Sequence, residues 1–260
     1  MKKETSWGNV ADWYADHVLS EDSYHKKVIL PNLLRMLSIK PGMRVLDIAC
    51  GSGFFAHEFS KIGAKVQGAD ISAELIELAK KHYSTHASFE VGAAHELKHI
   101  PDNSVDAVTL ILAIQNIAEV KETFSEAARV LTKTGRMYIV MNHPAFRIPG
   151  SSSWGWELPV SSVKAKESLY RRIDQYLTEK KIPITMHPGA SPDEKTISFH
   201  RPLQYYMKLI GNGGFAVSRL EEWISHKESQ QGPRQKEEDR MRKEIPLFMA
   251  FELIKQHGVY

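Results

Sequence analysis

The sequence has very little cysteine: Cys50 is the only one among 260 residues. A single cysteine excludes a disulfide within the chain and fits a reducing compartment. The longest apolar run, AVTLILAI, is far too short to cross a bilayer. The start, MKKETSWGNVADW, has no apolar segment behind its two lysines. We therefore expect no signal peptide, no membrane association and a cytoplasmic location.

An excess of one charge sign is also missing, because the formal net charge is only +3. So weak a charge does not favour a nucleic-acid partner. The patterns C-x-x-C, H-E-x-x-H and the nucleophile elbow are absent as well, so we expect neither a metal site nor a hydrolase. With 42% hydrophobic and 25% charged residues, the composition is that of a globular protein with a sizeable core.

Short β-rich runs alternate with helical patterns from Met43 onward, which is typical of parallel βαβ units. The pattern predicts a doubly wound α/β fold with a seven-stranded sheet, six strands parallel and the last antiparallel, and helices on both faces. The predicted strands are 43–49, 64–70, 87–92, 104–112, 135–143, 215–224 and 245–254. Helices are predicted at 53–63, 72–83 (with Ser72 as N-cap), 119–131 and 201–215.

Three parts of the chain are expected to differ in role. Residues 1–42 are aromatic-rich and predict an N-terminal helical cover. Residues 43–143 and 200–260 predict the Rossmann-like, cofactor-binding domain. In residues 144–199 the alternation of strand and helix patterns stops. This segment is rich in Pro, Gly, Ser and Trp and contains one helical pattern, at 161–181. We expect this segment to be an inserted cap that sets acceptor specificity at the carboxyl edge of the sheet.

The stretch VLDIACGSGFFA joins a strand to a helix through glycines. Gly51 and Gly53 leave room for a ligand to touch the backbone at a helix N-terminus. GSGFFA also fits the dinucleotide pattern, but Asp47 would then lie beside a pyrophosphate and repel it. This carboxylate suits an ammonium or sulfonium group instead, and Asp70, at the end of the second strand, suits the two hydroxyls of a ribose. S-adenosylmethionine has those parts.

With these residues in view, the sequence resembles the class I S-adenosylmethionine-dependent methyltransferases of the small-molecule type, with an insertion after strand five. VLDIACGSG is similar to their first motif, with Ala49 at the first glycine position, and VQGADIS to their second. PDNSVDAVTLILAI is similar to the segment around strand four. The resemblance covers residues 43 to 142 well and the rest loosely. It implies methyl transfer to a small-molecule O, N or C nucleophile, with S-adenosylhomocysteine as product.

Carried over by position, the resemblance implies a cofactor site. Asp47 would hold the amino group, Asp70 the ribose diol, and Ile71 would pack on the adenine. The usual adenine-binding acid is replaced by Ala93 in EVGAAHEL. The full set of implied cofactor residues is Tyr14, Asp47, Ala49, Gly51, Gly53, Asp70, Ile71, Ala93, Ala94, Leu110 and Ile111.

The acceptor side of the reaction is less marked in the sequence. His143 and His200, at the two ends of the insertion, are the candidate general bases. Aromatic and arginine side chains in the insertion suit a planar or anionic small molecule. They are the candidate acceptor-binding residues Trp154, Trp156, Tyr170 and Arg171.

Three rival interpretations remain open. An RNA methyltransferase of the same fold would use the same cofactor site and bind RNA with a steep salt dependence. A nicotinamide oxidoreductase would bind NAD instead. A binding module could keep the nucleoside pocket without turnover. The acceptor, the methylated atom and the oligomeric state are not specified by the sequence.

Overall fold

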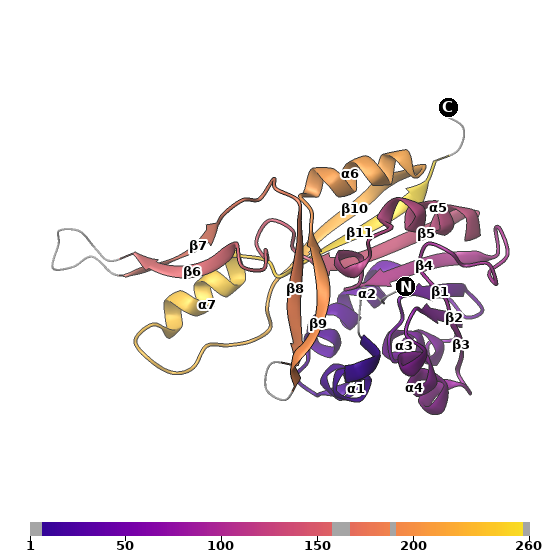
Figure 1. Cartoon of the computed structure of the whole chain (residues 1–260), viewed down its shortest axis with the longest axis horizontal. Coiled ribbons are helices and arrows are strands. Elements are labelled where there is room, and N and C mark those ends of the chain that lie inside the picture. The colour runs from indigo at the N-terminus through magenta and orange to yellow at the C-terminus, as the bar shows by residue number, and fades with distance from the viewer. Residues whose placement is uncertain (1–6, 158–166, 188–190, 257–260) are drawn as a thin grey trace.

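A computed structural model describes residues 7–157, 167–187 and 191–256, and its centre is a seven-stranded sheet (Figure 1). The strand order is β10-β11-β5-β4-β1-β2-β3. The strands are β1 (Arg44–Ile48), β2 (Lys65–Asp70), β3 (Ala87–Val91), β4 (Val105–Ile111), β5 (Leu131–Asn142), β10 (Phe215–Trp223) and β11 (Phe248–Lys255).

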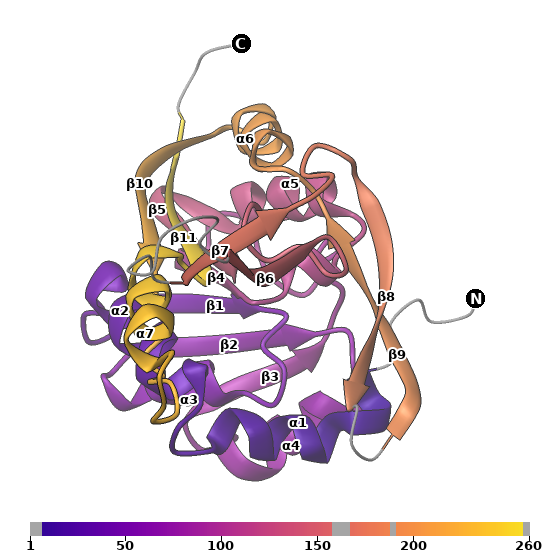
Figure 2. The ribbon, with the colours of Figure 1, turned by 90° about the vertical axis from the view of Figure 1, so that its left-hand side faces the viewer.

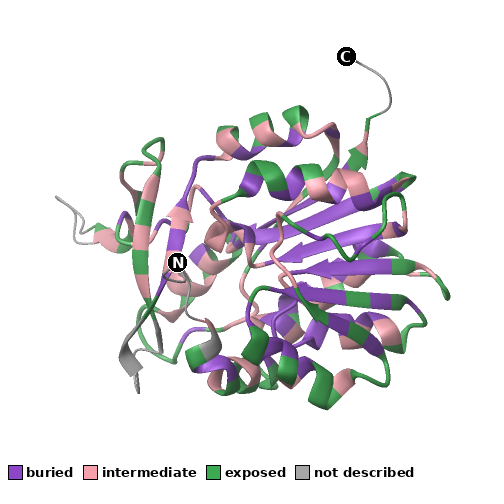
Figure 3. Cartoon of the chain, turned by 45° about the vertical axis from the view of Figure 1, so that its right-hand side comes forward, coloured by how far each residue is buried: buried purple, intermediate pink, exposed green. Residues whose placement is uncertain are grey.

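Strand direction confirms the predicted doubly wound sheet. The pairs β1–β2, β2–β3, β1–β4 and β4–β5 are parallel. The last strand, β11, is antiparallel to both β5 and β10, so six strands share one direction. Strand β4 and the second half of β5 are almost wholly buried (Figure 3). Their apolar runs follow from this, because helices cover both faces of the sheet.

Helices on the two faces bury alternate residues of each strand. On one face α2 (Leu30–Leu37), α3 (Phe54–Lys61) and α4 (Ala73–Tyr83) pack in a cluster with Val45. On the other face α5 (Val120–Val130) and α6 (Leu203–Asn212) pack in a cluster with Leu46 and Ile48. The period of two along β1 thus divides the core into two layers.

The N-terminal residues that the structure describes are helical. They form η1 (Trp7–Val10), α1 (Ala11–Leu19), the π-helical turn η2 (His25–Ile29) and then α2. The loop that precedes η2 is tied to the segment after β10. There Tyr24 shares a hydrogen bond of 3.1 Å with Ser225 Oγ, and His226 Nε2 lies 2.8 Å from Asp22 Oδ1. These contacts fix the cover to the sheet.

The insertion forms two hairpins. One pairs β6 (Ser152–Glu157) with β7 (Ser168–Ile173), and the other pairs β8 (Lys180–His187) with β9 (Ser191–His200). The helix predicted at 161–181 is therefore wrong over its described part, and residues 158–166 lie outside the described residues. Burial in β7 alternates with a period of two, and cross-strand pairing overrides the helical propensity of its leucine and arginines.

The hairpins point in different directions. In Figure 1, β6–β7 projects from the sheet beside α7 (Gln235–Glu244). Figure 2 shows β8–β9 passing the carboxyl ends of the parallel strands, close to α1. Only the second hairpin is therefore placed where ligands bind in open α/β sheets.

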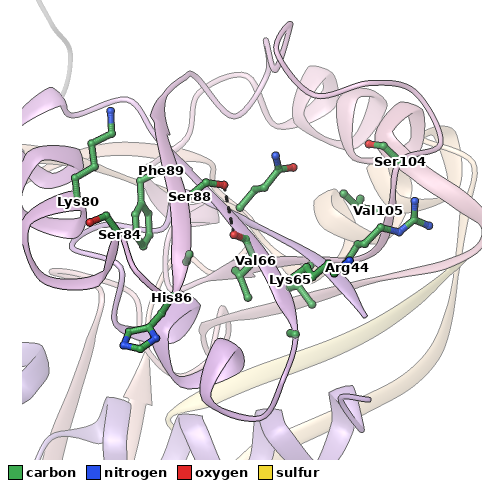
Figure 4. A pocket seen from close by; sticks show the side chains of 14 residues that line it. Arg44, Lys65, Val66, Lys80, Ser84, His86, Ser88, Phe89, Ser104 and Val105 are labelled. Atoms are coloured by element: carbon green, nitrogen blue, oxygen red, sulfur yellow. Dashed lines mark hydrogen bonds between the residues drawn. The ribbon is translucent and has the colours of Figure 1, made fainter. Parts of the chain in front are cut away.

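A broad hollow lies at the opposite, amino ends of the parallel strands (Figure 4). It has a volume of about 840 Å³, and its lining includes Arg44, Lys65 and Ser88. Arg44 is already bound by Asp106, which accepts from its Nε at 3.0 Å and its Nη2 at 2.6 Å. Residues 92–104, which connect β3 to β4, form a loop and no helix.

Candidate cofactor site

The turn after β1 is built on left-handed backbone. Ala49, Gly51 and Gly53 have φ angles of 55°, 56° and 86°. A Cβ atom on Gly51 would lie 3.2 Å from Tyr14 Cε1, so this glycine is required both for its conformation and for the close approach of the tyrosine ring. Ala49 adopts the same region at some cost in strain, and such strain is concentrated at functional sites.

Asp47 lies on β1 just before this turn, with 1% of its surface exposed. Thr109 Oγ1, on the neighbouring strand β4, donates to Asp47 Oδ1 at 2.6 Å. The other oxygen, Oδ2, is buried and has no hydrogen-bond partner among the described residues. Burial raises the pKa of this carboxyl to about 7, although the hydrogen bond from Thr109 opposes the shift. A cationic donor would satisfy the free oxygen.

Asp70 ends β2 and ties the two motifs together. Its Oδ2 accepts from the Gly51 backbone N–H at 2.9 Å, and its Oδ1 accepts from the Ser72 N–H at 2.9 Å. Burial raises the pKa of Asp70, while these backbone hydrogen bonds lower it. Ser72 also caps α4 as predicted, since its Oγ accepts from the Leu75 N–H at 3.2 Å.

A cavity of about 330 Å³ opens above these groups at the carboxyl ends of the strands. Six of the predicted cofactor residues line it: Tyr14, Ala49, Gly51, Asp70, Ile71 and Ile111. The half-exposed Ile71 presents an apolar surface there, whereas Tyr14 is packed over the glycine turn. Burial raises the pKa of Tyr14 above its usual value, and the charges of Asp70 and Asp47 raise it further.

The other five predicted cofactor residues, Asp47 among them, are not among those lining the cavity. Gly53 precedes α3, where a Cβ would lie 2.9 Å from the Phe89 ring. Leu110 is fully buried in β4. Ala93 forms an isolated bridge with Glu96, and Ala94 packs on the core. Their roles toward a cofactor stay predictions.

The helical cover supplies four lining residues that sequence reasoning did not identify: Trp7, Trp13, His17 and His25. The Trp7 and Tyr14 rings meet edge to face at 5.2 Å, and His25 lies edge-on to Tyr14 at 6.4 Å. His25 is 7% exposed, and its Nδ1 has no partner among the described residues. The closely spaced aromatic residues and the histidine of WGNVADWYADH are the feature of the sequence that could have indicated these lining residues.

The opposite wall comes from the segment after β4 and from the second hairpin. The short helix η3 (Ile114–Asn116) contributes Gln115 and Asn116, and the hairpin contributes Ile184, Thr185 and Ser198. Sequence reasoning missed these residues, because nothing in the sequence shows which hairpin crosses the site.

The predicted acceptor residues lie elsewhere. Trp154 and Trp156 line a separate cavity of about 240 Å³ beside α7. Arg171 stacks over the Trp154 ring at 5.0 Å and donates from Nη2 to the Phe146 carbonyl at 2.5 Å. Tyr170, which is half exposed, covers Gly155 on the paired strand. The structure does not bring these four side chains to the cofactor cavity, because β6–β7 points away from it.

The two candidate bases are engaged in hydrogen bonds outside the cavity lining. His143 Nε2 lies 2.7 Å from Glu222 Oε1, and its Nδ1 accepts from the Ala145 N–H at 3.2 Å. Burial lowers the pKa of His143, although Glu222 opposes this. His200 Nε2 lies 2.8 Å from the Tyr176 carbonyl oxygen. As general bases both stay predictions.

Comparison with known proteins follows this geometry. Residues 46–139 match the family described as Methyltransferase domain. Over 111 residues, the chain is 28% identical to the demethylmenaquinone methyltransferase of Tropheryma whipplei (strain Twist), covering 42% of this chain and 46% of the relative. Over 101 residues, it is 28% identical to the ubiquinone biosynthesis O-methyltransferase of Xanthomonas oryzae pv. oryzae (strain PXO99A), covering 38% of this chain and 42% of the relative. The chain thus spans less than half the length of either relative.

The fold comparison extends further along the chain. An S-adenosylmethionine-dependent methyltransferase from Mesorhizobium loti superimposes with a TM-score of 0.64 at 24% identity, covering 86% of this chain and 95% of that one. At this identity the likeness shows the fold alone. No helix in the described ranges has the length and apolar character needed to span a bilayer.

Proposed function

We propose that this chain, which contains a class I methyltransferase domain, binds S-adenosylmethionine and transfers its methyl group to a small-molecule O, N or C nucleophile. The observation that carries the proposal is the buried, unpartnered Oδ2 of Asp47 beside a left-handed glycine turn that Asp70 holds in place. This arrangement suits a ligand with an ammonium group at one end and a ribose at the other.

The residues present fit that cofactor. Asp47 would accept from its amino group, and Gly51, having no Cβ, would let its amino-acid portion approach the backbone. Asp70 would take the ribose hydroxyls with the lone pairs left by its two backbone hydrogen bonds. Ile71 would pack on the adenine. A pyrophosphate at the glycine turn would instead meet the Asp47 carboxylate, which argues against NAD.

When bound, the cofactor supplies an electrophilic methyl group on a positively charged sulfur, and its departure leaves a neutral thioether. The contribution of the protein is to align the acceptor with that methyl group and to exclude water. Trp7, Trp13 and Tyr14 would provide this cover from the N-terminal side. The proposed small-molecule acceptor agrees with the quinone-pathway names of the two relatives, and we propose a cytoplasmic location from the single cysteine.

Calorimetric titration with S-adenosylmethionine, S-adenosylhomocysteine and NAD tests the proposal. We expect both adenosyl ligands to bind in the micromolar range, NAD not to bind, and Asp70→Ala to weaken binding strongly. Asp106→Ala is the matched control, since this carboxylate lies at the opposite end of the sheet against Arg44. Binding of NAD in place of the adenosyl ligands would overturn the proposal.

A further inference from the structure

The backbone is strained where β4 leads into the acceptor side of the cavity. Leu112 has a φ of 53°, a left-handed conformation that is costly for a bulky residue. Its N–H donates to the Val140 carbonyl at 2.7 Å, and its own carbonyl accepts from Gln115 Nε2 at 2.5 Å. The strained turn therefore fixes the orientation of the Gln115 amide.

With its nitrogen bound to Leu112, the Gln115 amide presents its oxygen as a hydrogen-bond acceptor. That oxygen is buried and has no partner in the part of the chain that the structure describes. Buried polar atoms of native proteins are nearly always hydrogen-bonded, so an unpartnered one beside a cavity calls for a ligand donor. Gln115 itself lines the cavity.

The wall around Gln115 is held in place by the second hairpin. Asn116 Nδ2 donates to the Ile197 carbonyl of β9 at 2.8 Å, which joins η3 to the hairpin. Ile184, Thr185 and Ser198 of the same hairpin then face the cavity. A wall assembled from two elements in this way gives the amide oxygen a fixed position.

The chemistry of the lining restricts the ligand charge. On the cavity side of Gln115 the polar side chains are uncharged (Asn116, Asn142, Thr185 and Ser198). Among the described residues that line the cavity there is no lysine or arginine, and the carboxylate present is Asp70, at the cofactor end. Arg147 and Arg201 line a smaller hollow of about 40 Å³ that Gln115 also borders, where Arg147 donates to Asn142 Oδ1 and Arg201 to the Ile117 carbonyl. Because neither arginine lines the cavity itself and each already donates to an acceptor of the protein, an anionic group in the cavity would lose its hydration without a cationic side chain in the lining.

We infer that this end of the cavity is an acceptor subsite for an uncharged small molecule that donates an O–H or N–H hydrogen bond to Gln115 Oε1. The inference rests on the proposed function and gives it a substrate class. It also moves acceptor recognition from the β6–β7 hairpin to η3 and the β8–β9 hairpin.

The test uses methylcatechol and two analogues of it. The dimethyl ether lacks the O–H groups, and dihydroxybenzoate carries a carboxylate in addition to them. Each is titrated into the protein saturated with S-adenosylhomocysteine. We expect methylcatechol to bind about tenfold more tightly than either analogue, the size of one hydrogen bond. Gln115→Met should abolish the preference over the ether and leave the affinity for S-adenosylhomocysteine unchanged.

Gln67→Met is the matched control, because Gln67 is exposed at the amino-end hollow and should keep the full preference. The inference is overturned if the ether or the benzoate binds as well as methylcatechol, if none of the three binds, or if Gln115→Met keeps the preference. Failure of S-adenosylhomocysteine to bind the unaltered protein is seen before any ring compound is added, and it would instead remove the proposed function.

Discussion

Thr109 donates a hydrogen bond of 2.6 Å to one oxygen of Asp47, and the second oxygen of that carboxylate is left buried and unpartnered. The carboxylate is thereby oriented by its neighbour on β4, and one acceptor atom is left free. The pKa of about 7 makes its charge depend on pH in the neutral range.

Cofactor affinity should therefore rise with pH through Asp47. Below pH 7 the folded, ligand-free protein holds a proton on this carboxyl, and an ammonium group must expel it in order to bind. We expect the dissociation constant of S-adenosylmethionine to increase by up to about tenfold for each pH unit below 7. Calorimetry in two buffers of different ionisation enthalpy should detect the released proton. Asp47→Asn should bind weakly with no such pH dependence, and a flat profile for the unaltered protein would contradict the prediction.

Asp70 should contribute both to the turn and to the ligand. Asp70→Ala removes two hydrogen bonds from backbone N–H groups, at Gly51 and Ser72, in addition to the proposed ribose contact. We expect cofactor affinity to fall by roughly 10–100-fold, the range for hydrogen bonds to a charged group. Thermal melting without ligand separates the two roles. Asp70→Asn should keep most of the melting temperature and still bind weakly, whereas equal binding by Asp70→Asn and the unaltered protein would exclude a role for the charge.

Gly51→Ala should separate backbone strain from the contact with Tyr14. A side chain at φ 56° costs about 1–2 kcal/mol, and the new Cβ would also press on the tyrosine ring at 3.2 Å. The control is Gly42→Ala, which has a φ of 81° with nothing within 4 Å of the added Cβ. We expect Gly51→Ala to lose at least as much stability as Gly42→Ala in urea unfolding, and only Gly51→Ala to lose cofactor affinity. Equal cofactor affinity of the two variants would count against a ligand at the turn.

His25 should make the protein less stable in acid. Burial lowers its pKa from 6.5 to about 4, and His17 adds to the shift. Below pH 6.5 the unfolded chain binds a proton that the folded chain takes up only near pH 4, so the free energy of unfolding falls as the pH drops across this window. Between pH 7.5 and 4.5 this effect should amount to about 2–3 kcal/mol.

The measurement for His25 is urea unfolding at the two pH values for the unaltered protein and for His25→Phe. Between pH 7.5 and 4.5, the free energy of unfolding of His25→Phe should fall by about 2–3 kcal/mol less than that of the unaltered protein. His82→Phe, at an exposed histidine of α4, should follow the unaltered protein. If the free energy of unfolding of His25→Phe fell as much in acid as that of the unaltered protein, the buried neutral histidine would be excluded as the cause of the acid destabilisation.

Replacement of His143 should affect stability more than turnover. Its ring joins Glu222 to the backbone after β5, so His143→Gln should cost about 1–3 kcal/mol through unsatisfied buried groups. Once an acceptor is available, kcat and its pH profile should stay near those of the unaltered protein. If the variant kept its melting temperature but lost one limb of the pH profile of kcat, that result would support His143 as general base.

The sequence by itself determined the sheet and the placement of the predicted cofactor residues of β1 and β2 at one edge of it. The spacing of the apolar residues specifies which segments are strands and which are helices, because each segment must place its apolar residues in the core. Asp47, Gly51 and Asp70 lie within 24 residues of each other in chain order, and parallel strands must bring their carboxyl ends to one edge. Local spacing therefore translates directly into geometry for these residues.

Only the tertiary structure decided how the insertion is arranged around the cavity. Whether residues 168–187 form strands depends on pairing with distant partners, such as Trp154 with Arg171 and Lys180 with His200, and local propensity does not report such pairing. The hairpin that crosses the cavity is joined to η3 by long-range contacts such as the hydrogen bond between Asn116 and Ile197, 81 residues apart. Side chains that meet through such long-range contacts leave no periodic signal in the sequence.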